Sequence, residues 1–151
     1  FIRATPGDRR RLDVSIAFAD AAIGGASISL DLDKPEILRR LARARTFCRL
    51  ADIDAMKAAG LGRGGSLDNA IVVDGDRILN AGGLRDPDEF VLHKALDMVG
   101  DLALAGAPII GRIEAMKPGH DLNVRFLRRL AAEASAVERV VLTQTAIPAD
   151  L

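Results

Sequence analysis

The chain has 151 residues, enough for one compact domain, and we expect a single domain. Its 21 basic and 21 acidic residues cancel, so no overall field favours a nucleic-acid partner or an anionic membrane. One cysteine excludes an intramolecular disulfide, and two histidines are too few for a Cys/His-rich zinc module. No apolar run approaches the roughly 18 residues of a membrane-spanning helix, so we expect no transmembrane segment and a cytoplasmic location.

The first part of the chain predicts a hairpin of two strands. Residues 1–11 are polar and predict a solvated connection. Residues 14–18 and 27–32 alternate between apolar and polar side chains, as half-buried strands do. The Gly24-Gly25 pair between them predicts the turn of the hairpin.

Short elements are expected in the middle of the chain. The pattern predicts a helix over 37–43, an extended piece over 45–48 and a second helix over 53–59. Residues 61–66 are rich in glycine but lack the lysine of a phosphate-binding loop, so they predict a turn. A buried strand over 70–73 then leads into a tight hairpin at Asp74-Gly75.

A long helix is expected over 86–104, with Asp86 as its cap and Glu89 completing a pattern like a capping box. His93, Asp97 and Asp101 follow one another at intervals of four residues and therefore share one helical face. An imidazole and a carboxylate one turn apart can bind one metal ion or share one proton. A solvated polar stripe is the alternative, although apolar residues flank the line on both sides.

The last part of the chain predicts a strand over 109–116, a second long helix that begins at His120, and an edge strand over 140–142. Lys117-Pro118-Gly119 forms the turn before His120. Two long helices and five or six strands predict an α+β class: a two-layer sandwich in which both helices lie on one face of a mainly antiparallel sheet.

The polar line contains most of a hydrolytic zinc site. A catalytic zinc takes three protein ligands and a water. The helix offers His93 and Asp97, and either His120 or Cys48 could be the third, but then no general acid remains. A lone histidine at a helix start is otherwise a capping or surface residue. Counted from its residues, the chain therefore lacks one group of a complete hydrolytic zinc site, which is either the third metal ligand or the general acid.

Four stretches resemble the UDP-3-O-acyl-N-acetylglucosamine deacetylases of lipid A biosynthesis: 44–47, 64–73, 90–102 and 117–123. They occur in the family's order, and the combination is specific although each stretch alone is weak. The family has two α+β domains with the active site between them. The resemblance implies that residues 1–151 are the second domain, with a fold like domain 2 of ribosomal protein S5 and an acyl-passage insert around 45–66.

The resemblance also implies a catalytic role for five residues. His93 and Asp97 are two of three ligands of Zn²⁺, with Fe²⁺ as the alternative metal, which polarises the acetamide carbonyl. The Thr46 hydroxyl stabilises the oxyanion. His120, held in its protonated form by Asp101, donates a proton to the departing amine.

Three further residues are implied in binding the UDP-sugar acyl substrate. Lys94 faces substrate oxygens such as the diphosphate, and Lys117 binds substrate or sets the charge near His120. Phe47 lines the passage for the acyl chain. Cys48 and Arg49 replace a glycine and a large apolar residue of the family pattern, which affects the shape of that passage rather than the metal chemistry.

In the family, the first domain supplies another zinc-binding histidine and a glutamate base, and no His-x-x-Glu-His segment occurs here. Because the chain begins with Phe1, we expect it to be a piece of a longer polypeptide, inactive without the N-terminal domain. The alternatives are a non-catalytic module that binds UDP-sugar or acyl groups or docks on a partner, and a stable domain whose polar line is only structural.

Overall fold

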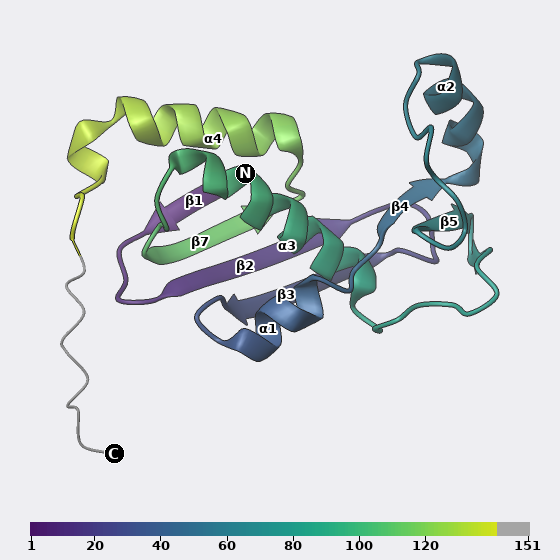
Figure 1. Ribbon diagram of the computed structural model, residues 1–151, viewed down its shortest axis with the longest axis horizontal. Coiled ribbons are helices and arrows are strands. Elements are labelled where there is room, and N and C mark those ends of the chain that lie inside the picture. The colour runs from purple at the N-terminus through teal and green to yellow at the C-terminus, as the bar shows by residue number, and fades with distance from the viewer. Residues whose placement is uncertain (142–151) are drawn as a thin grey trace.

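The computed structural model describes residues 1–141, and its larger sheet has four strands in the order β1-β7-β2-β3 (Figure 1). β2 and β7 are parallel, whereas the β1/β7 and β2/β3 pairs are antiparallel. The strands of this sheet are β1 (Ile2–Thr5), β2 (Arg10–Ala17), β3 (Gly25–Asp31) and β7 (Gly111–Met116).

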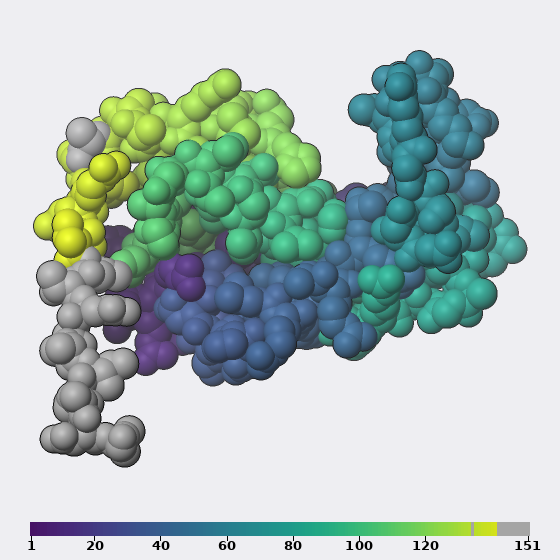
Figure 2. All heavy atoms as spheres, viewed as in Figure 1, coloured from purple at the N-terminus to yellow at the C-terminus, as the bar shows by residue number. Residues whose placement is uncertain are grey.

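A smaller sheet has the strand order β4-β5-β6, with one parallel and one antiparallel pair. Its strands are β4 (Thr46–Arg49), β5 (Ala70–Asp74) and β6 (Arg77–Ile78). The 3-10 turn η1 (Leu50–Asp52) and α2 (Ile53–Ala58) follow β4. In Figure 2 the α2 segment stands apart from the helices over the larger sheet, and a broad recess lies between it and the end of α4 where that helix begins.

The helices α3 (Glu89–Leu102) and α4 (His120–Ala132) pack against one another over the larger sheet (Figure 1). α3 packs on β2 and β3, and α4 contacts β1. The remaining helical segments are α1 (Pro35–Leu41), η2 (Ala103–Ala105) and η3 (Ala134–Ala136). α3 therefore lies at the centre of the molecule, between α1 and α4.

The hydrophobic core lies between α3 and the larger sheet. Alternate residues of β2 are buried because successive side chains of a strand point to opposite faces. α3 buries a stripe that includes Leu92, Ala95 and Met98, each 0% exposed. Burying one large aliphatic side chain stabilises the fold by about 1.5–3 kcal/mol. This stripe fixes which face of α3 remains for polar residues.

The predicted α+β class is confirmed, as are the hairpin between β2 and β3 and the turn at Asp74-Gly75. The prediction of one sheet is wrong, because the structure has two mixed sheets, but the larger sheet is antiparallel in two of its three strand pairs and both long helices pack over it, as predicted. The start of the chain is predicted as a solvated connection, but it contains β1. β1 buries no side chain completely, so its burial does not alternate as that of a half-buried strand does, and it forms by pairing with β7. The likeness to domain 2 of ribosomal protein S5 stays a prediction.

Two local predictions are wrong. α3 begins at Glu89 rather than near Asp86, and its N-cap residue Asp88 makes no side-chain capping bond. The Asp86 carboxylate instead accepts hydrogen bonds from Arg40 and from the Asp88 amide. For the predicted strand 140–142, residues 140 and 141 belong to no strand, and residue 142 lies outside the described residues. Between residues 1 and 141, no helix has the length and apolar character needed to cross a bilayer.

Candidate metal and catalytic site

One turn of α3 carries a close group of three polar side chains. His93 Nε2 lies 3.3 Å from Asp97 Oδ1, and the Lys94 ammonium lies 2.8 Å from Asp97 Oδ2. The side chains of His93 and Asp97 are each 14% exposed, because the apolar stripe of α3 draws this face toward the core. The helical spacing of the sequence thus places an imidazole and a carboxylate against one another at the edge of the core.

The imidazole of His93 is held in a partly buried setting. The Phe47 ring packs edge-on against it at a centroid distance of 6.0 Å. Burial lowers the pKa of His93 below its usual 6.5, and this effect outweighs the attraction of Asp97 for the charged form. His93 is therefore neutral at pH 7, which is the form that binds metal.

Either neutral tautomer of His93 leaves a group unsatisfied. The Nδ1 atom is buried and has no hydrogen-bond partner within residues 1–141. The Ala44 carbonyl lies near enough to favour the charged ring but does not meet hydrogen-bond geometry. If Nδ1 carries the proton, the lone pair of Nε2 faces the Asp97 carboxylate, and two acceptors oppose one another. A cation between Nε2 and Oδ1 resolves this conflict, so the pair fits a divalent metal.

A second polar group joins α3 to α4. The Asp101 Oδ2 atom accepts a hydrogen bond from His120 Nδ1 at 2.8 Å and another from Asn123 Nδ2 at 2.7 Å. The His120 side chain is 69% exposed, whereas Asn123 is fully buried. Sequence reasoning did not assign a role to Asn123; the signal was its position three residues after His120, on the same face of α4.

The turn before α4 is strained. Lys117 has a φ of 52° and is the only described residue other than glycine whose φ is positive. The left-handed region costs a side-chain-bearing residue about 1–2 kcal/mol, and such strain is typical of functional sites. The Lys117 amide donates to the Ser15 carbonyl at 2.7 Å, which ties this turn to β2 and directs His120. The Lys117 ammonium has no carboxylate partner in the described part of the chain.

The two polar groups lie close enough to interact. The charge of His120, like that of Lys94, contributes to lowering the pKa of His93. Thr46 is the exposed first residue of β4, directly before Phe47. The predicted site residues of α3, α4 and β4 therefore lie around one region of the surface, although no interaction of the Thr46 side chain with either polar group is seen among residues 1–141.

The described residues provide an incomplete metal site. No three His, Cys, Asp or Glu side chains within residues 1–141 gather around one point. His120 is turned to Asp101, and the burial of Cys48 raises the pKa of its thiol, which disfavours the thiolate that a metal needs. Neither of the two candidates for a third ligand joins His93 and Asp97.

An ion pair that sequence reasoning missed fixes β4 beside α3. The Arg45 guanidinium binds both oxygens of Glu89 at 2.9 and 3.0 Å, and the Arg45 amide donates to Oε1 at 3.0 Å. Glu89 is 0% exposed. Because Arg45 precedes Thr46 and Phe47, this pair positions the strand that brings both residues toward α3.

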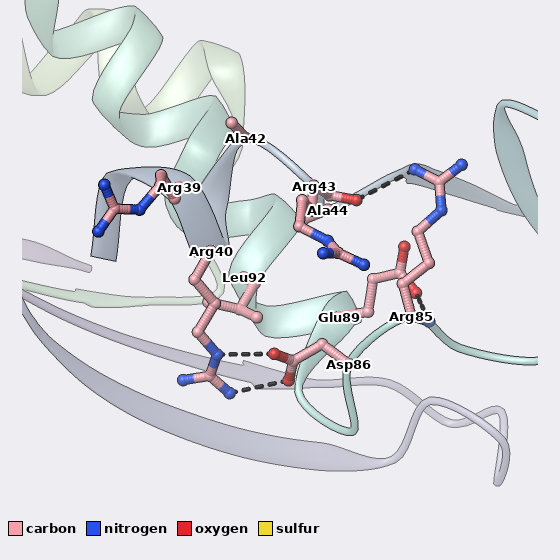
Figure 3. A pocket seen from close by; sticks show the side chains of 9 residues that line it. All are labelled: Arg39, Arg40, Ala42, Arg43, Ala44, Arg85, Asp86, Glu89 and Leu92. Carbon is pink, nitrogen blue, oxygen red and sulfur yellow. Dashed lines mark hydrogen bonds and ion pairs between the residues drawn. The ribbon is translucent and has the colours of Figure 1, made fainter. Parts of the chain in front are cut away.

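A pocket of about 690 Å³ lies between α1 and the start of α3 (Figure 3). The Arg40 guanidinium crosses it to the Asp86 carboxylate, and Arg85 reaches the Arg43 carbonyl (Figure 3). None of the predicted site residues lines this pocket, nor the apolar pocket of about 340 Å³ near the end of α3. The candidate site instead lies where α3 meets Phe47 of β4 and the first turn of α4.

Comparison with known proteins identifies the family of the chain. Residues 1–132 match the family UDP-3-O-acyl N-acetylglycosamine deacetylase. A UDP-3-O-acyl-N-acetylglucosamine deacetylase of Phenylobacterium zucineum is 49% identical over 131 residues, which are 87% of this chain and 45% of the relative. The enzyme of the same name from Myxococcus xanthus is 47% identical over 136 residues, or 90% of this chain and 43% of the relative.

A third relative of that name, from Anaeromyxobacter sp., is 46% identical over 148 residues, which are 97% of this chain and 49% of the relative. The chain thus spans less than half the length of these three relatives. The match nevertheless extends from β1 to the end of α4 and includes every predicted site residue. The chain belongs to the UDP-3-O-acyl N-acetylglycosamine deacetylase family.

Proposed function

We propose that this chain forms one side of the zinc site of an enzyme that removes the N-acetyl group from UDP-3-O-(3-hydroxyacyl)-N-acetylglucosamine in lipid A biosynthesis. The observation that carries the proposal is the His93–Asp97 pair, a neutral imidazole 3.3 Å from a carboxylate with no third ligand beside them within residues 1–141. The relatives bear the name of this deacetylase, which supports the substrate class.

His93 and Asp97 would hold the metal, Zn²⁺ or Fe²⁺. When bound, it would polarise the acetamide carbonyl and lower the pKa of a water. Burial keeps the His93 lone pair free of a proton, and Asp97 supplies the negative charge that offsets the cation. Lys94, whose ammonium lies 2.8 Å from Asp97, would bind substrate oxygens such as the diphosphate.

His120 would act as the general acid. Its Nδ1–H donates to Asp101, which leaves Nε2 as the atom that carries a proton on the exposed side of the ring. In amide hydrolysis, water oxygen bonds to the carbonyl carbon, the carbon–nitrogen bond breaks, and the departing nitrogen takes a proton. Asp101 accepts the bond from Nδ1–H and so holds the ring in place for that transfer. The Thr46 hydroxyl donates to the carbonyl oxygen as negative charge develops on it.

Lys117 and Phe47 would bind the two ends of the substrate. The Lys117 ammonium, without a carboxylate partner in residues 1–141, is available to a phosphate oxygen. Phe47 is part of an aromatic group with Phe18 and Phe90, at ring-centroid distances of 5.4 and 5.0 Å, which offers an apolar surface to an acyl chain. Phe47 itself belongs to the 45–66 segment, the proposed acyl passage.

The remainder of the site would come from the N-terminal domain of the longer protein, as a third metal ligand and a general base. The isolated chain is then expected to bind zinc weakly and to turn over no substrate. Hydrolysis by the purified 151-residue chain alone would contradict this part of the proposal.

The test is a zinc titration of the chain by calorimetry, with His93→Ala and Asp97→Ala as separate variants. Loss of one ligand should lower zinc affinity by at least about tenfold. Asp54→Ala, which removes a carboxylate from α2, is the matched control and should change nothing. Zinc affinity that is indifferent to both ligand substitutions would overturn the proposal. UDP binding without any dependence on metal would instead indicate a non-catalytic binding module.

A further inference from the structure

Asn123 lies on α4 one turn after His120, and its side chain reaches across to α3. We propose that Asn123 is a positioning residue: its amide fixes the Asp101 carboxylate, and through it the tautomer and direction of the His120 imidazole. The importance of that direction rests on the proposed function, in which His120 donates a proton. The geometry of the three residues stands independently of it.

The contacts place both donors on one oxygen. Asn123 Nδ2 lies 2.7 Å and His120 Nδ1 lies 2.8 Å from Asp101 Oδ2. Hydrogen bonds to an ionised carboxylate are stronger than bonds between neutral groups. Two of them on the same atom restrict rotation of the carboxylate, so the position of Oδ2 is set by the residue that can move least.

That residue is Asn123. It is 0% exposed, and its backbone amide donates to the Gly119 carbonyl at 2.9 Å in the first turn of α4. His120 is 69% exposed, so few contacts other than Asp101 hold its ring. Packing therefore holds the amide, the amide holds the carboxylate, and the carboxylate holds the imidazole.

The side-chain amide of Asn123 has one polar atom, Oδ1, without a hydrogen-bond partner within residues 1–141. A carboxylate can only accept hydrogen bonds, so the Asn123 NH₂ group must face Asp101 and the Oδ1 atom must face away. Oδ1 is buried and has no donor within residues 1–141. A buried acceptor without a donor opposes stability. This pattern fits a residue that is present for the bond from Nδ2 to Asp101 rather than for packing.

The consequence is a defined tautomer of His120. With Asp101 Oδ2 fixed, the neutral ring must place its proton on Nδ1, which leaves Nε2 facing outward. Without the Asn123 amide, Asp101 can rotate away, and the His120 proton can occupy either nitrogen. A misdirected Nε2 is then no longer aligned for proton transfer.

The test is ¹⁵N NMR of the imidazole nitrogens in the metal-free chain, where the ratio of the Nδ1–H to the Nε2–H tautomer of neutral His120 is measured. The chain has two histidines, and His93→Gln assigns their signals. Asn123→Leu keeps a similar side-chain volume and removes the donor. It should lower the ratio at least about threefold, the factor that a hydrogen bond of ordinary net strength provides.

Leu127→Ala is the matched control, because it loosens the packing of α4 without touching Asp101. A shift of the tautomer ratio in Asn123→Leu but not in Leu127→Ala supports the proposal. An unchanged ratio in folded Asn123→Leu, or an equal shift in Leu127→Ala, would overturn it. Because the measurement uses neither metal nor substrate, its failure is distinguishable from failure of the zinc titration.

A second measurement does not require Asn123 to be replaced. Hydrogen exchange of the Asn123 side-chain amide should be at least about tenfold slower in the natural chain than in Asp101→Ala, where the acceptor is gone, since a hydrogen bond to a charged group is worth about 1.5–3 kcal/mol. Equal exchange rates in the two proteins would show that the amide is not bound to Asp101 and would refute the proposal.

Discussion

Two polar regions one turn apart on α3 differ in how completely their hydrogen bonds are formed. Glu89, fully buried, accepts from the amide and guanidinium of Arg45 and, at 2.6 Å, from the Arg85 amide. His93 is also largely buried, yet its Nδ1 has no partner in residues 1–141 and its Nε2 faces a carboxylate. The oxygens of Glu89 are thus occupied by hydrogen bonds from the chain itself. The imidazole of His93 and the facing carboxylate of Asp97 instead keep lone pairs that a ligand can use.

The difference separates a structural role from a functional one. A buried charge persists without large cost only when it is paired and hydrogen-bonded, and Glu89 meets that condition within the chain. His93 does not, because its Nδ1 has no partner within residues 1–141, and the one described non-glycine residue with a positive φ, Lys117, lies shortly before His120. Incomplete pairing and strain therefore occur together at the candidate site.

The largest expected effect comes from breaking the complete region. Glu89→Gln keeps the shape of the side chain but removes its charge and leaves Arg45 without a counter-ion. Breaking one partner of a buried pair typically costs about 3–5 kcal/mol, so the free energy of unfolding by urea should fall by roughly that amount. Glu36→Gln, on the exposed first turn of α1, is the control and should have almost no effect. A cost of Glu89→Gln as small as that of the control would contradict a structural role.

A smaller effect is expected from relieving strain in the incomplete region. Lys117→Gly should raise the free energy of unfolding by up to about 1 kcal/mol relative to Lys117→Ala, because glycine adopts a φ of 52° without steric conflict. Both variants lack the ammonium, so both should bind substrate more weakly in the full-length enzyme. If the glycine variant is no more stable than the alanine variant, the Lys117 backbone stores no strain.

The smallest effect concerns the pH dependence of the free energy of unfolding, to which His93 and Glu89 contribute over different pH ranges. Burial lowers the folded-state pKa of His93 below 6.5. As the pH falls below about 6.5, the unfolded chain takes up the proton first, so the free energy of unfolding should decrease until the folded pKa is reached. The pKa of Glu89 is held below 4.5, since the bonds from Arg45 outweigh the opposing effect of burial, and its contribution is lost only at lower pH.

His93→Gln isolates the first of these pH ranges. It should remove the decrease in stability just below pH 6.5 and leave the decrease at lower pH intact, as measured by urea unfolding across a pH series. A slope near pH 6 that is the same in this variant and in the natural chain would show that His93 titrates as an ordinary exposed histidine.

Features that depend on local spacing were predictable from the sequence. The β2/β3 hairpin, the long helices and the shared face of His93, Asp97 and Asp101 follow from periods of two and 3.6 residues, together with glycine pairs at turns. The resemblance to the deacetylase family rested on the same local stretches and is confirmed by the match over residues 1–132. The metal and catalytic roles of the site residues stay predictions.

Only the tertiary structure decided which distant residues complete each polar group. Arg45 and Glu89 lie 44 positions apart, and Asp101 and Asn123 lie 22 apart, so no period of the sequence connects them. β1 forms only because β7 offers it a partner, and the Asp86 carboxylate binds Arg40 and the Asp88 amide, before α3 begins, rather than an amide within the helix. Local patterns determine the elements and the faces they present, but which polar groups end satisfied depends on packing between elements, where burial makes every missing partner costly.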